Sequence, residues 1–410
     1  MNDTPTSAAA LRGHGSEAPP TRKGWLARAA EAGEIAERGA PEADRVGRLS
    51  GETMSALHER GLFRLLLPRA MNGHEVELPD YLHVIEALAS RDASTAWCVG
   101  QGNCCAMVAA YVDRDVADRI WTHDPRAVLA WGPGSAEAVA RDGGYRVTAR
   151  SSFVSGGHHA TWLGILGAGV RDADGGLRPG RDGTPETRTL LFPAAGTDLI
   201  VNWDVLGLRG TGSDGFEVTD LFIPEACSVV RATMSENRRP HGGGTLYGFP
   251  QMPVHAAGFA ATAIGTARGF VDAFLDMAQN KVPRLHSAPL RDSAVVQDDV
   301  GQAEARLSAV RAWLFSEAGR AWEIVAETGS LPVANRMRIR LASTHAIREA
   351  KAAVDGLFDA AGTSSVFASG PFERRFRDIH MIAQQIQGRK AHYGTVGAWM
   401  LGHDPDMNVI

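Results

Sequence analysis

The chain has 410 residues, more than a single hydrophobic core usually accommodates, so two or three domains are expected. Hydrophobic residues make up 44% of it and charged residues 22%, a balance that excludes a disordered or fibrous protein. The formal net charge of −5 excludes a broadly cationic surface, so neither nucleic acid nor a membrane is an expected partner.

The cysteine pattern and the N-terminal residues indicate in which cellular compartment the protein is expected. Cys98, Cys104, Cys105 and Cys227 show no Cys-x-x-Cys spacing, so neither a metal site nor a disulfide framework is predicted. Residues 1–24 are expected to form a disordered tail, because they are small and polar and lack the apolar stretch of a secretion signal. No run of eighteen apolar residues occurs, and a cytoplasmic protein is therefore expected.

Residues 25–127 have the pattern of an all-α domain. Within it, Leu82, Ile85 and Leu88 recur at helical spacing. Pro79 precedes them and marks the expected start of that helix, since proline is tolerated in a first helical turn.

Residues 128–235 change to the texture of strands. Tyr145, Val147 and Ala149 alternate with polar neighbours, which is the period of a half-buried strand. The stretch 171–188 is dense in Asp, Gly and Pro between two apolar runs, which indicates a long hairpin loop. A middle β domain is predicted.

Helical periodicity returns after a stretch of low complexity. Residues 236–250, with three consecutive glycines, are expected to be a linker, and residues 251–410 a helical bundle. Apolar residues spaced three and four apart place the four bundle helices near 264–278, 300–314, 347–361 and 386–401.

Four short motifs occur in this order along the chain: Arg91–Trp97 (RDASTAW), Phe153–Ala160 (FVSGGHHA), Gly207–Ser213 (GLRGTGS) and Arg377–His380 (RDIH). On these motifs the chain resembles the acyl-CoA dehydrogenase superfamily, and most closely its branch of flavin-dependent monooxygenases that receive reduced flavin from a separate reductase. The resemblance implies an α+β fold: an N-terminal all-α domain, a middle β-barrel domain and a C-terminal four-helix bundle. It also implies a flavin, FMN or FAD, between the β domain and the bundle.

The resemblance assigns several residues to the flavin ring. It places Ser155 near flavin N5, where a hydroxyl can donate or accept a hydrogen bond, although a serine that only completes a turn is the alternative. Gly156 and Gly157 would allow the backbone to approach the ring closely, or would serve a tight turn. Trp131 would cover the ring, or would be an ordinary core residue.

The phosphate of the cofactor needs cations. Arg268 and Arg284 match positions where relatives carry arginine, and exposed arginines at helix ends are the alternative for both. Arg284 resembles the arginine that reaches the flavin phosphate of a neighbouring subunit, which implies a homo-oligomer, a tetramer in this family.

The residues after the Arg-Asp pair bear on the reaction. Where many acyl-CoA dehydrogenases carry a catalytic glutamate, this chain has Ile386. The missing carboxylate base argues against a dehydrogenase without excluding one. The monooxygenase relatives often carry histidine one position earlier, and here that position is Gln385, beside Gln384 as a further candidate for the cofactor. Glutamine does not exchange a proton near neutral pH. Another group would then handle the proton: the candidates are His159, which matches a frequent histidine of the family, and its neighbour His158. Asn103 or Gln101 would orient the substrate, and a satisfied structural polar residue is the alternative for each of the four.

The sequence thus favours a monooxygenase that uses reduced flavin and O2 to oxygenate a small aromatic or amine-bearing substrate. A separate NAD(P)H-flavin reductase would supply the reduced flavin. An FAD-dependent acyl-CoA dehydrogenase-like enzyme and a catalytically silent flavoprotein are the alternatives. Oxygen chemistry requires exclusion of water. Trp97, Met107, Trp131 and Phe153 are the expected walls of such a dry pocket.

Overall fold

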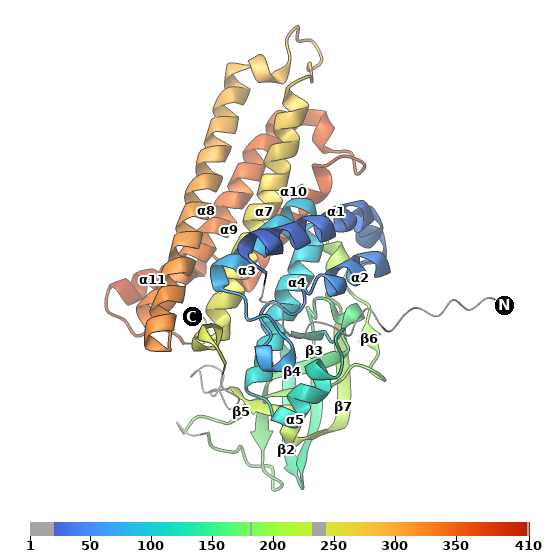
Figure 1. Ribbon diagram of the computed structural model, residues 1–410, viewed down its shortest axis with the longest axis vertical. Helices are drawn as coiled ribbons and strands as arrows, with labels where there is room; N and C mark the ends of the chain where they lie inside the picture. Colours follow the sequence, from blue (N-terminus) through green and yellow to red (C-terminus); the bar gives the residue numbers. More distant parts are fainter. Residues whose placement is uncertain (1–19, 181–182, 232–242, 408–409) are drawn as a thin grey trace, which may run out of the picture.

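The computed structural model describes residues 20–180, 183–231, 243–407 and 410. Figure 1 shows three parts in chain order: a helical N-terminal part, a sheet at one end of the molecule, and a bundle of long helices at the other end. The predicted fold class is confirmed, because helices, then strands, then a bundle follow one another as expected.

The N-terminal part begins earlier than predicted. The side chain of Thr21 accepts a hydrogen bond from the backbone N–H of Gly24 and caps a helix that starts at Arg22. The prediction of a tail through residue 24 is therefore wrong at its end, while residues 1–19 lie outside the described residues. The helices of this part are α1 (Arg22–Val46), α2 (Gly51–Glu59), α3 (Leu78–Arg91), α4 (Ala93–Ala106) and α5 (Arg114–Ala117).

Helix α3 starts at Leu78 with Pro79 in its first turn, so the predicted start is confirmed. Asp92 ends α3 and caps α4, because its carboxylate accepts hydrogen bonds from the backbone N–H and the hydroxyl of Thr95, at 2.8 and 2.7 Å. The RDASTAW motif is therefore a junction between two helices, and it fixes where α4 runs.

The middle part is one eight-stranded sheet. Its strands pair in the order β6-β7-β3-β2-β4-β5-β8, and β1 also pairs with β4. The β domain was predicted as a barrel, whereas in the described residues the pairings form an open sheet whose ends are β6 and β8. The strands are β1 (Leu129–Gly132), β2 (Gly134–Arg141), β3 (Gly144–Ser151), β4 (Trp162–Arg171), β5 (Thr187–Pro193), β6 (Leu199–Ile200), β7 (Gly215–Pro224) and β8 (Ser228–Val230).

Strands β1 and β2 follow each other along the same edge of β4. Trp131 pairs in parallel register with Gly164, and Ala138 with Val170. A Cβ at Gly164 would lie 2.7 Å from Cε3 of Trp131, so this glycine gives the indole its room. The register thereby sets the position of Trp131 on the sheet.

The predicted linker is partly structured. Residues 232–242 lie outside the described residues, but 245–250 pack firmly, since Leu246, Tyr247 and Phe249 are all fully buried. The hydroxyl of Tyr247 donates to the carbonyl of Leu66 at 2.6 Å. The loose-linker prediction is therefore wrong for 245–250, where apolar side chains outweigh the glycines nearby.

The C-terminal part differs from the predicted bundle in its fourth helix, which is α10 and not the segment 386–401. Residues 386–388 form only a 3-10 turn, and α11 after it is short and packs on α9. The helices are α7 (Gln251–Ala278), α8 (Ala294–Thr328), α9 (Val333–Ala361), α10 (Glu373–Gln384) and α11 (Ala391–Met400).

Helix α7 is the central element, packed between α3 and α9. Small residues allow the close approach to α3: a Cβ at Gly258 would lie 2.9 Å from the hydroxyl oxygen of Tyr81, and one at Gly265 would lie 2.2 Å from the carbonyl oxygen of Glu86. This contact holds the first turns of α7 beside α4 and opposite the sheet.

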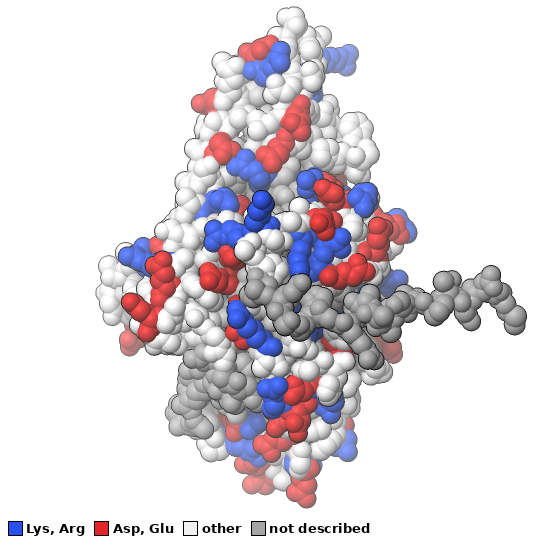
Figure 2. Space-filling view, viewed as in Figure 1, with Lys and Arg blue, Asp and Glu red and all other residues white. Residues whose placement is uncertain are grey.

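The face of the molecule seen in Figure 2 carries acidic and basic side chains interspersed over all three parts. This mixture agrees with the modest net charge of −5. In the described part of the chain, no helix has the length and apolar character needed to cross a membrane.

Candidate active site

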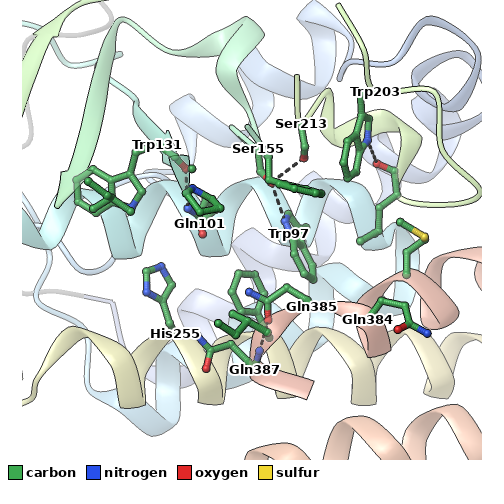
Figure 3. A pocket seen from close by; sticks show the side chains of 18 of the residues that line it. Trp97, Gln101, Trp131, Ser155, Trp203, Ser213, His255, Gln384, Gln385 and Gln387 are labelled. Atoms are coloured by element: carbon green, nitrogen blue, oxygen red, sulfur yellow. Dashed lines mark hydrogen bonds between the residues drawn. The ribbon is translucent and has the colours of Figure 1, made fainter. Parts of the chain in front are cut away.

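A pocket of about 450 Å³ opens where α4, the sheet, the start of α7 and the end of α10 meet (Figure 3). This volume lies in the usual range for small-molecule sites. Its lining residues are Trp97, Gln101, Trp131, Gly132, Pro133, Phe153, Ser155, Leu166, Trp203, Leu208, Ser213, Met252, His255, Phe259, Met381, Gln384, Gln385, Ile386 and Gln387.

The pocket wall is uncharged. None of the described residues that line it is Asp, Glu, Lys or Arg, and His255 is the single histidine among them. Ile386, where a dehydrogenase glutamate was sought, presents an aliphatic side chain at the rim. Removal of a proton from carbon by a carboxylate base has no candidate in this wall.

Ser155 stands at one end of a chain of hydroxyl groups. Its Oγ accepts from the indole N–H of Trp97 at 3.0 Å and lies 2.7 Å from Oγ of Ser213. Ser213 Oγ lies 2.7 Å from Oγ1 of Thr211, and that hydroxyl donates to the carbonyl of Leu208 at 2.7 Å. The dashed lines in Figure 3 show the part of this chain that faces the pocket.

The direction of these hydrogen bonds follows from the two ends. An indole N–H only donates and a carbonyl oxygen only accepts. The hydroxyl of Thr211 donates its proton to the carbonyl of Leu208, so it must accept from Ser213. The hydroxyl of Ser213 therefore donates to Thr211 and must accept from Ser155. Ser155 thus keeps one lone pair, and no proton, for a partner in the pocket.

Trp131 and Gly132 form the wall on the sheet side. Trp131 is 2% exposed, and its carbonyl accepts a hydrogen bond from Nε2 of Gln101 at 3.2 Å. A Cβ at Gly132 would lie 1.9 Å from the carbonyl oxygen of Ser152, so only glycine fits there. Trp131 is both a buried residue and a wall of the pocket, so the two sequence interpretations do not conflict.

Phe153 and Trp203 form the rim. Phe153 has a left-handed backbone with φ of 56° and a ring that is 60% exposed, which meets the indole of Trp203 edge-on at 5.7 Å. Asp214 holds Trp203 in place by accepting from its backbone N–H at 2.8 Å, and the same carboxylate lies 2.7 Å from Nε2 of His158. An exposed aromatic ring with a strained backbone at a pocket mouth is a frequent mark of a binding site.

The glutamines of the 384–387 segment have different tasks. Gln384 is exposed at the rim. Gln385 uses its Oε1 to accept from the backbone N–H of Gln387 at 2.6 Å, so it caps the turn in addition to lining the pocket. Gln387 accepts at Oε1 from the guanidinium of Arg340, which is buried behind it.

His255 is the site residue that sequence reasoning missed. It lies in the second turn of α7 and points into the pocket beneath Trp131 and Gln101 (Figure 3). Burial, and secondarily the positive charge of Arg340, lowers the pKa of its imidazole to about 4. The signal was present in the sequence, because His255 is the single titratable side chain between residues 251 and 267 of an apolar helix.

Two predicted proton-handling or orienting residues do not line the pocket. Asn103 is fully buried, donates to the carbonyls of Leu62 and Val99 and accepts from the backbone N–H of Leu66, so the structure gives it a structural role and no support for a catalytic one. His159 also lies outside the pocket lining. Burial lowers its pKa to about 4, and its position gives no support to the prediction that it handles protons for the substrate.

The glycines of the FVSGGHHA motif serve the turn. Gly156 has a φ of 75°, which favours glycine, and its N–H donates to the carbonyl of Thr211 at 2.9 Å. Neither Gly156 nor Gly157 is among the lining residues, so their approach to the ring stays a prediction. The lining glycine with a close backbone contact is Gly132, which lies against the carbonyl of Ser152.

The two predicted phosphate-binding arginines lie away from this pocket. Arg268 on α7 donates two hydrogen bonds of 2.8 and 3.1 Å to Glu304 on α8. Its charge is therefore already neutralised by an ion pair. Arg284 is exposed in the connection between α7 and α8, and Figure 1 shows this connection at the far tip of the bundle. Within one chain, neither arginine belongs to the pocket.

Asp378 connects the bundle to the loop behind Ser155. Its fully buried carboxylate accepts from the backbone N–H of Leu208 at 2.6 Å, and Leu208 is the residue on which the hydroxyl chain ends. Burial raises the pKa of Asp378 to about 7, with Asp92 adding to this rise and the hydrogen bond from Leu208 opposing it. The GLRGTGS and RDIH motifs therefore meet at this contact.

Comparison with known proteins identifies the family. The model of the acyl-CoA dehydrogenase N-terminal domain matches residues 26–120, and that of the C-terminal domain matches residues 257–388. Together they cover more than half of the chain, which belongs to the acyl-CoA dehydrogenase superfamily.

Curated relatives narrow this to a branch. Indole-3-acetate monooxygenase of Pseudomonas putida is 27% identical over 89% of this chain and 90% of its own length. The oxygenase component of the FADH(2)-dependent resorcinol hydroxylase of Rhizobium is 26% identical over 93% of this chain and 94% of its own. The chain is a flavin-dependent oxidoreductase of the monooxygenase branch, as the sequence favoured.

Solved structures agree with the fold. XiaF from Streptomyces, in complex with FADH2 and glycerol, superimposes with a TM-score of 0.87 at 23% identity, over 94% of this chain and 96% of that one. The 3-HSA hydroxylase from Rhodococcus gives a TM-score of 0.85 at 24% identity, over 93% and 98%.

The residues of the pocket fit the ring system of a flavin. Flat aromatic side chains form the walls, and Ser155 offers an acceptor. Ser155, Trp97 and Trp131 would hold the ring. Reduced flavin, when bound, supplies two electrons to dioxygen, so that one oxygen atom enters a substrate and the other leaves as water.

Proposed function

We propose that this chain is the oxygenase component of a two-component system: it takes reduced FMN or FAD from a separate NAD(P)H-flavin reductase and oxygenates a small aromatic molecule. The single observation that carries the proposal is the uncharged, aromatic-walled pocket with Ser155 as its hydrogen-bond acceptor. Relatives named for indole-3-acetate and resorcinol support an aromatic substrate.

The direction of the hydroxyl chain supports a preference for reduced flavin. In reduced flavin N5 carries a hydrogen and donates, whereas in oxidised flavin N5 only accepts. With Ser155 near N5, the lone pair that this serine keeps is matched to the reduced form. Such a preference suits a protein that receives its flavin already reduced.

In this proposal, binding of the cofactor phosphate depends on the assembly of several subunits. The pocket of one chain offers no lysine or arginine among its described lining residues, so a phosphate would need a cation from elsewhere. Arg284 from a neighbouring subunit is proposed for this task, in a homotetramer acting in the cytoplasm. Arg268 is less suitable because Glu304 already neutralises it.

The class of reaction is tested without knowledge of the natural substrate. Anaerobic titrations with reduced and oxidised FMN and FAD are expected to show tight binding of a reduced flavin and weak binding of the oxidised one. Product formed from a panel of phenols and indoles with reduced flavin and heavy-isotope dioxygen would carry the label.

Two outcomes would contradict the proposal. Bleaching of bound oxidised flavin by an acyl-CoA, without any reductase, would identify a dehydrogenase. Absence of flavin binding in both redox states, in a stable oligomer, would refute a flavoenzyme of either kind.

A further inference from the structure

His255 belongs to the pocket wall, yet one of its ring nitrogens has no polar partner among the described residues. Its Nε2 is buried and has no hydrogen-bond partner in the described part of the chain, whereas buried polar atoms nearly always have one. The imidazole lies parallel to the ring of Phe259, with centroids 5.8 Å and planes 4° apart. Packing therefore holds the plane of a ring whose hydrogen-bonding capacity is unused.

The imidazole is neutral at physiological pH. Its pKa is lowered to about 4 by burial and, secondarily, by the charge of Arg340. A neutral imidazole has one N–H donor and one acceptor nitrogen. A half-turn about χ2 exchanges the ring nitrogens with the ring carbons, so an acceptor nitrogen is presented to the pocket without movement of α7.

The surroundings of His255 select against anionic ligands. Arg340 is the nearby cation, but it is 2% exposed and is covered by Gln387, whose Oε1 accepts from its guanidinium. A carboxylate in the pocket would lose its hydration without gaining an ion pair, which is unfavourable. An uncharged aromatic ring, by contrast, matches the apolar side chains of Phe259 and Met252 in the same pocket wall.

Resting on the monooxygenase reaction proposed above, we propose that the substrate is an uncharged hydroxyarene or N–H heteroarene and that His255 accepts its O–H or N–H hydrogen bond and takes that proton as oxygen is transferred.

The step assigned to His255 is one proton transfer. The O–H or N–H bond of the substrate breaks, a new N–H bond forms on the imidazole, and the electron pair stays on the substrate, where it enriches the ring carbons that receive oxygen. Dioxygen is the oxidant and reduced flavin the reductant of the overall reaction. The proton passes to solvent as product leaves. A weakly basic imidazole suffices, because the hydroxyl becomes a far stronger acid while its ring gives up electron density.

Binding selectivity is the first test. Three probes are compared under anaerobic conditions with reduced FMN: p-cresol, its methyl ether, which cannot donate, and p-hydroxyphenylacetate, which adds a carboxylate. The wild-type protein is expected to bind p-cresol about tenfold more tightly than either of the others. His255→Phe keeps the stacked ring but removes both nitrogens, and it should bind p-cresol and the ether equally within about twofold.

His159→Phe is the matched control. His159 also has a buried Nε2 without a partner in the described residues and a pKa lowered to about 4, but it lies outside the pocket. The same substitution there is expected to leave the selectivity among the three probes unchanged. A general effect of removing a buried imidazole is thereby separated from an effect of His255.

Turnover separates proton transfer from binding. His255→Gln keeps an acceptor that does not take a proton near neutral pH, so p-cresol affinity should stay within about threefold while kcat falls by about 100-fold. Circular dichroism establishes that each variant folds. Should His255→Phe fail to fold, the wild-type selectivity and the kcat of His255→Gln decide the question.

The outcomes separate this inference from the proposed function. Wild-type preference for the ether or the acid would overturn the inference, as would unchanged selectivity in a His255→Phe protein that still forms product, or an unchanged kcat in His255→Gln. Wild-type protein that binds no reduced flavin and forms no product from any aromatic compound would instead refute the proposed function.

Discussion

At the scale of single residues, hydrogen-bond direction decides what Ser155 offers. Its hydroxyl proton is committed to Ser213 because Thr211 and Leu208 leave no other arrangement. A serine in the same place with an unrestrained hydroxyl would donate or accept equally well. The proposed selectivity for reduced flavin therefore depends on residues behind Ser155 as much as on Ser155 itself.

Ser213→Ala tests this dependence. Without its acceptor, the Ser155 hydroxyl is able to turn and donate into the pocket, so the preference for reduced over oxidised flavin should fall by about three- to tenfold. Anaerobic titration with both flavin forms measures it. Ser90→Ala is the control, because the hydroxyl of Ser90 only donates to the carbonyl of Ala87 on α3. A ratio unchanged in Ser213→Ala but altered in Ser155→Ala would show that the direction argument is wrong.

At the scale of elements, strand β1 forms a pocket wall because it approaches the 152–153 backbone without an intervening side chain. Gly132→Ala would place a Cβ 1.9 Å from the Ser152 carbonyl, and backbone cannot yield as a side chain can. The free energy of unfolding should fall by about 1–3 kcal/mol, and flavin affinity should fall with it.

Gly169→Ala is the matched control for this prediction. Gly169 lies in strand β4, and a Cβ there meets nothing within 4 Å. Urea denaturation of both variants measures the difference. Equal stability of the two would show that the segment carrying Phe153 is free to move away from β1.

At the scale of the whole molecule, Asp378 joins the bundle to the loop that ends the hydroxyl chain. Its folded-state pKa of about 7 lies above the ordinary 3.8. Between these two pH values the carboxyl group is protonated in the folded protein and ionised in the unfolded chain. The stabilising contribution is complete below pH 3.8, declines as pH rises, and is lost above about pH 7.

Asp378→Asn is expected to remove this pH dependence. Relative to wild type, the variant should become more stable as pH rises from about 5 to 8, by on the order of 2–4 kcal/mol. Thermal unfolding across this range measures it. The control is Asp298→Asn, at an exposed carboxylate of α8. Parallel pH profiles for wild type and Asp378→Asn would contradict a buried carboxylate that titrates near neutrality.

The assembly prediction also belongs to this scale. Arg284→Ala should weaken binding of reduced FMN by about tenfold, because one charge-assisted hydrogen bond to the phosphate is lost. Binding of reduced riboflavin, which lacks the phosphate, should not change. Arg291→Ala, at an exposed arginine in the same connection, is the control. Equal losses for FMN and riboflavin would contradict a role of Arg284 at the phosphate.

The sequence by itself determined the order of the three parts and the family. Apolar residues at helical or strand spacing report local structure directly, and the four motifs report ancestry. It also placed Trp131, Ser155, Gln384 and Gln385, which all line the pocket. They lie in or beside segments whose local geometry sets their direction, so their place in the wall could be read from the sequence.

Only the tertiary structure decided which polar residues face the pocket. Asn103 and His159 are as polar as His255, but the contacts that engage or exclude them come from residues far away in the chain, such as Leu62 for Asn103. His255 enters the site because α7 is packed between α3 and α9, with its first turns opposite the sheet. Local periodicity does not encode that placement, since it depends on which distant surfaces bury one another.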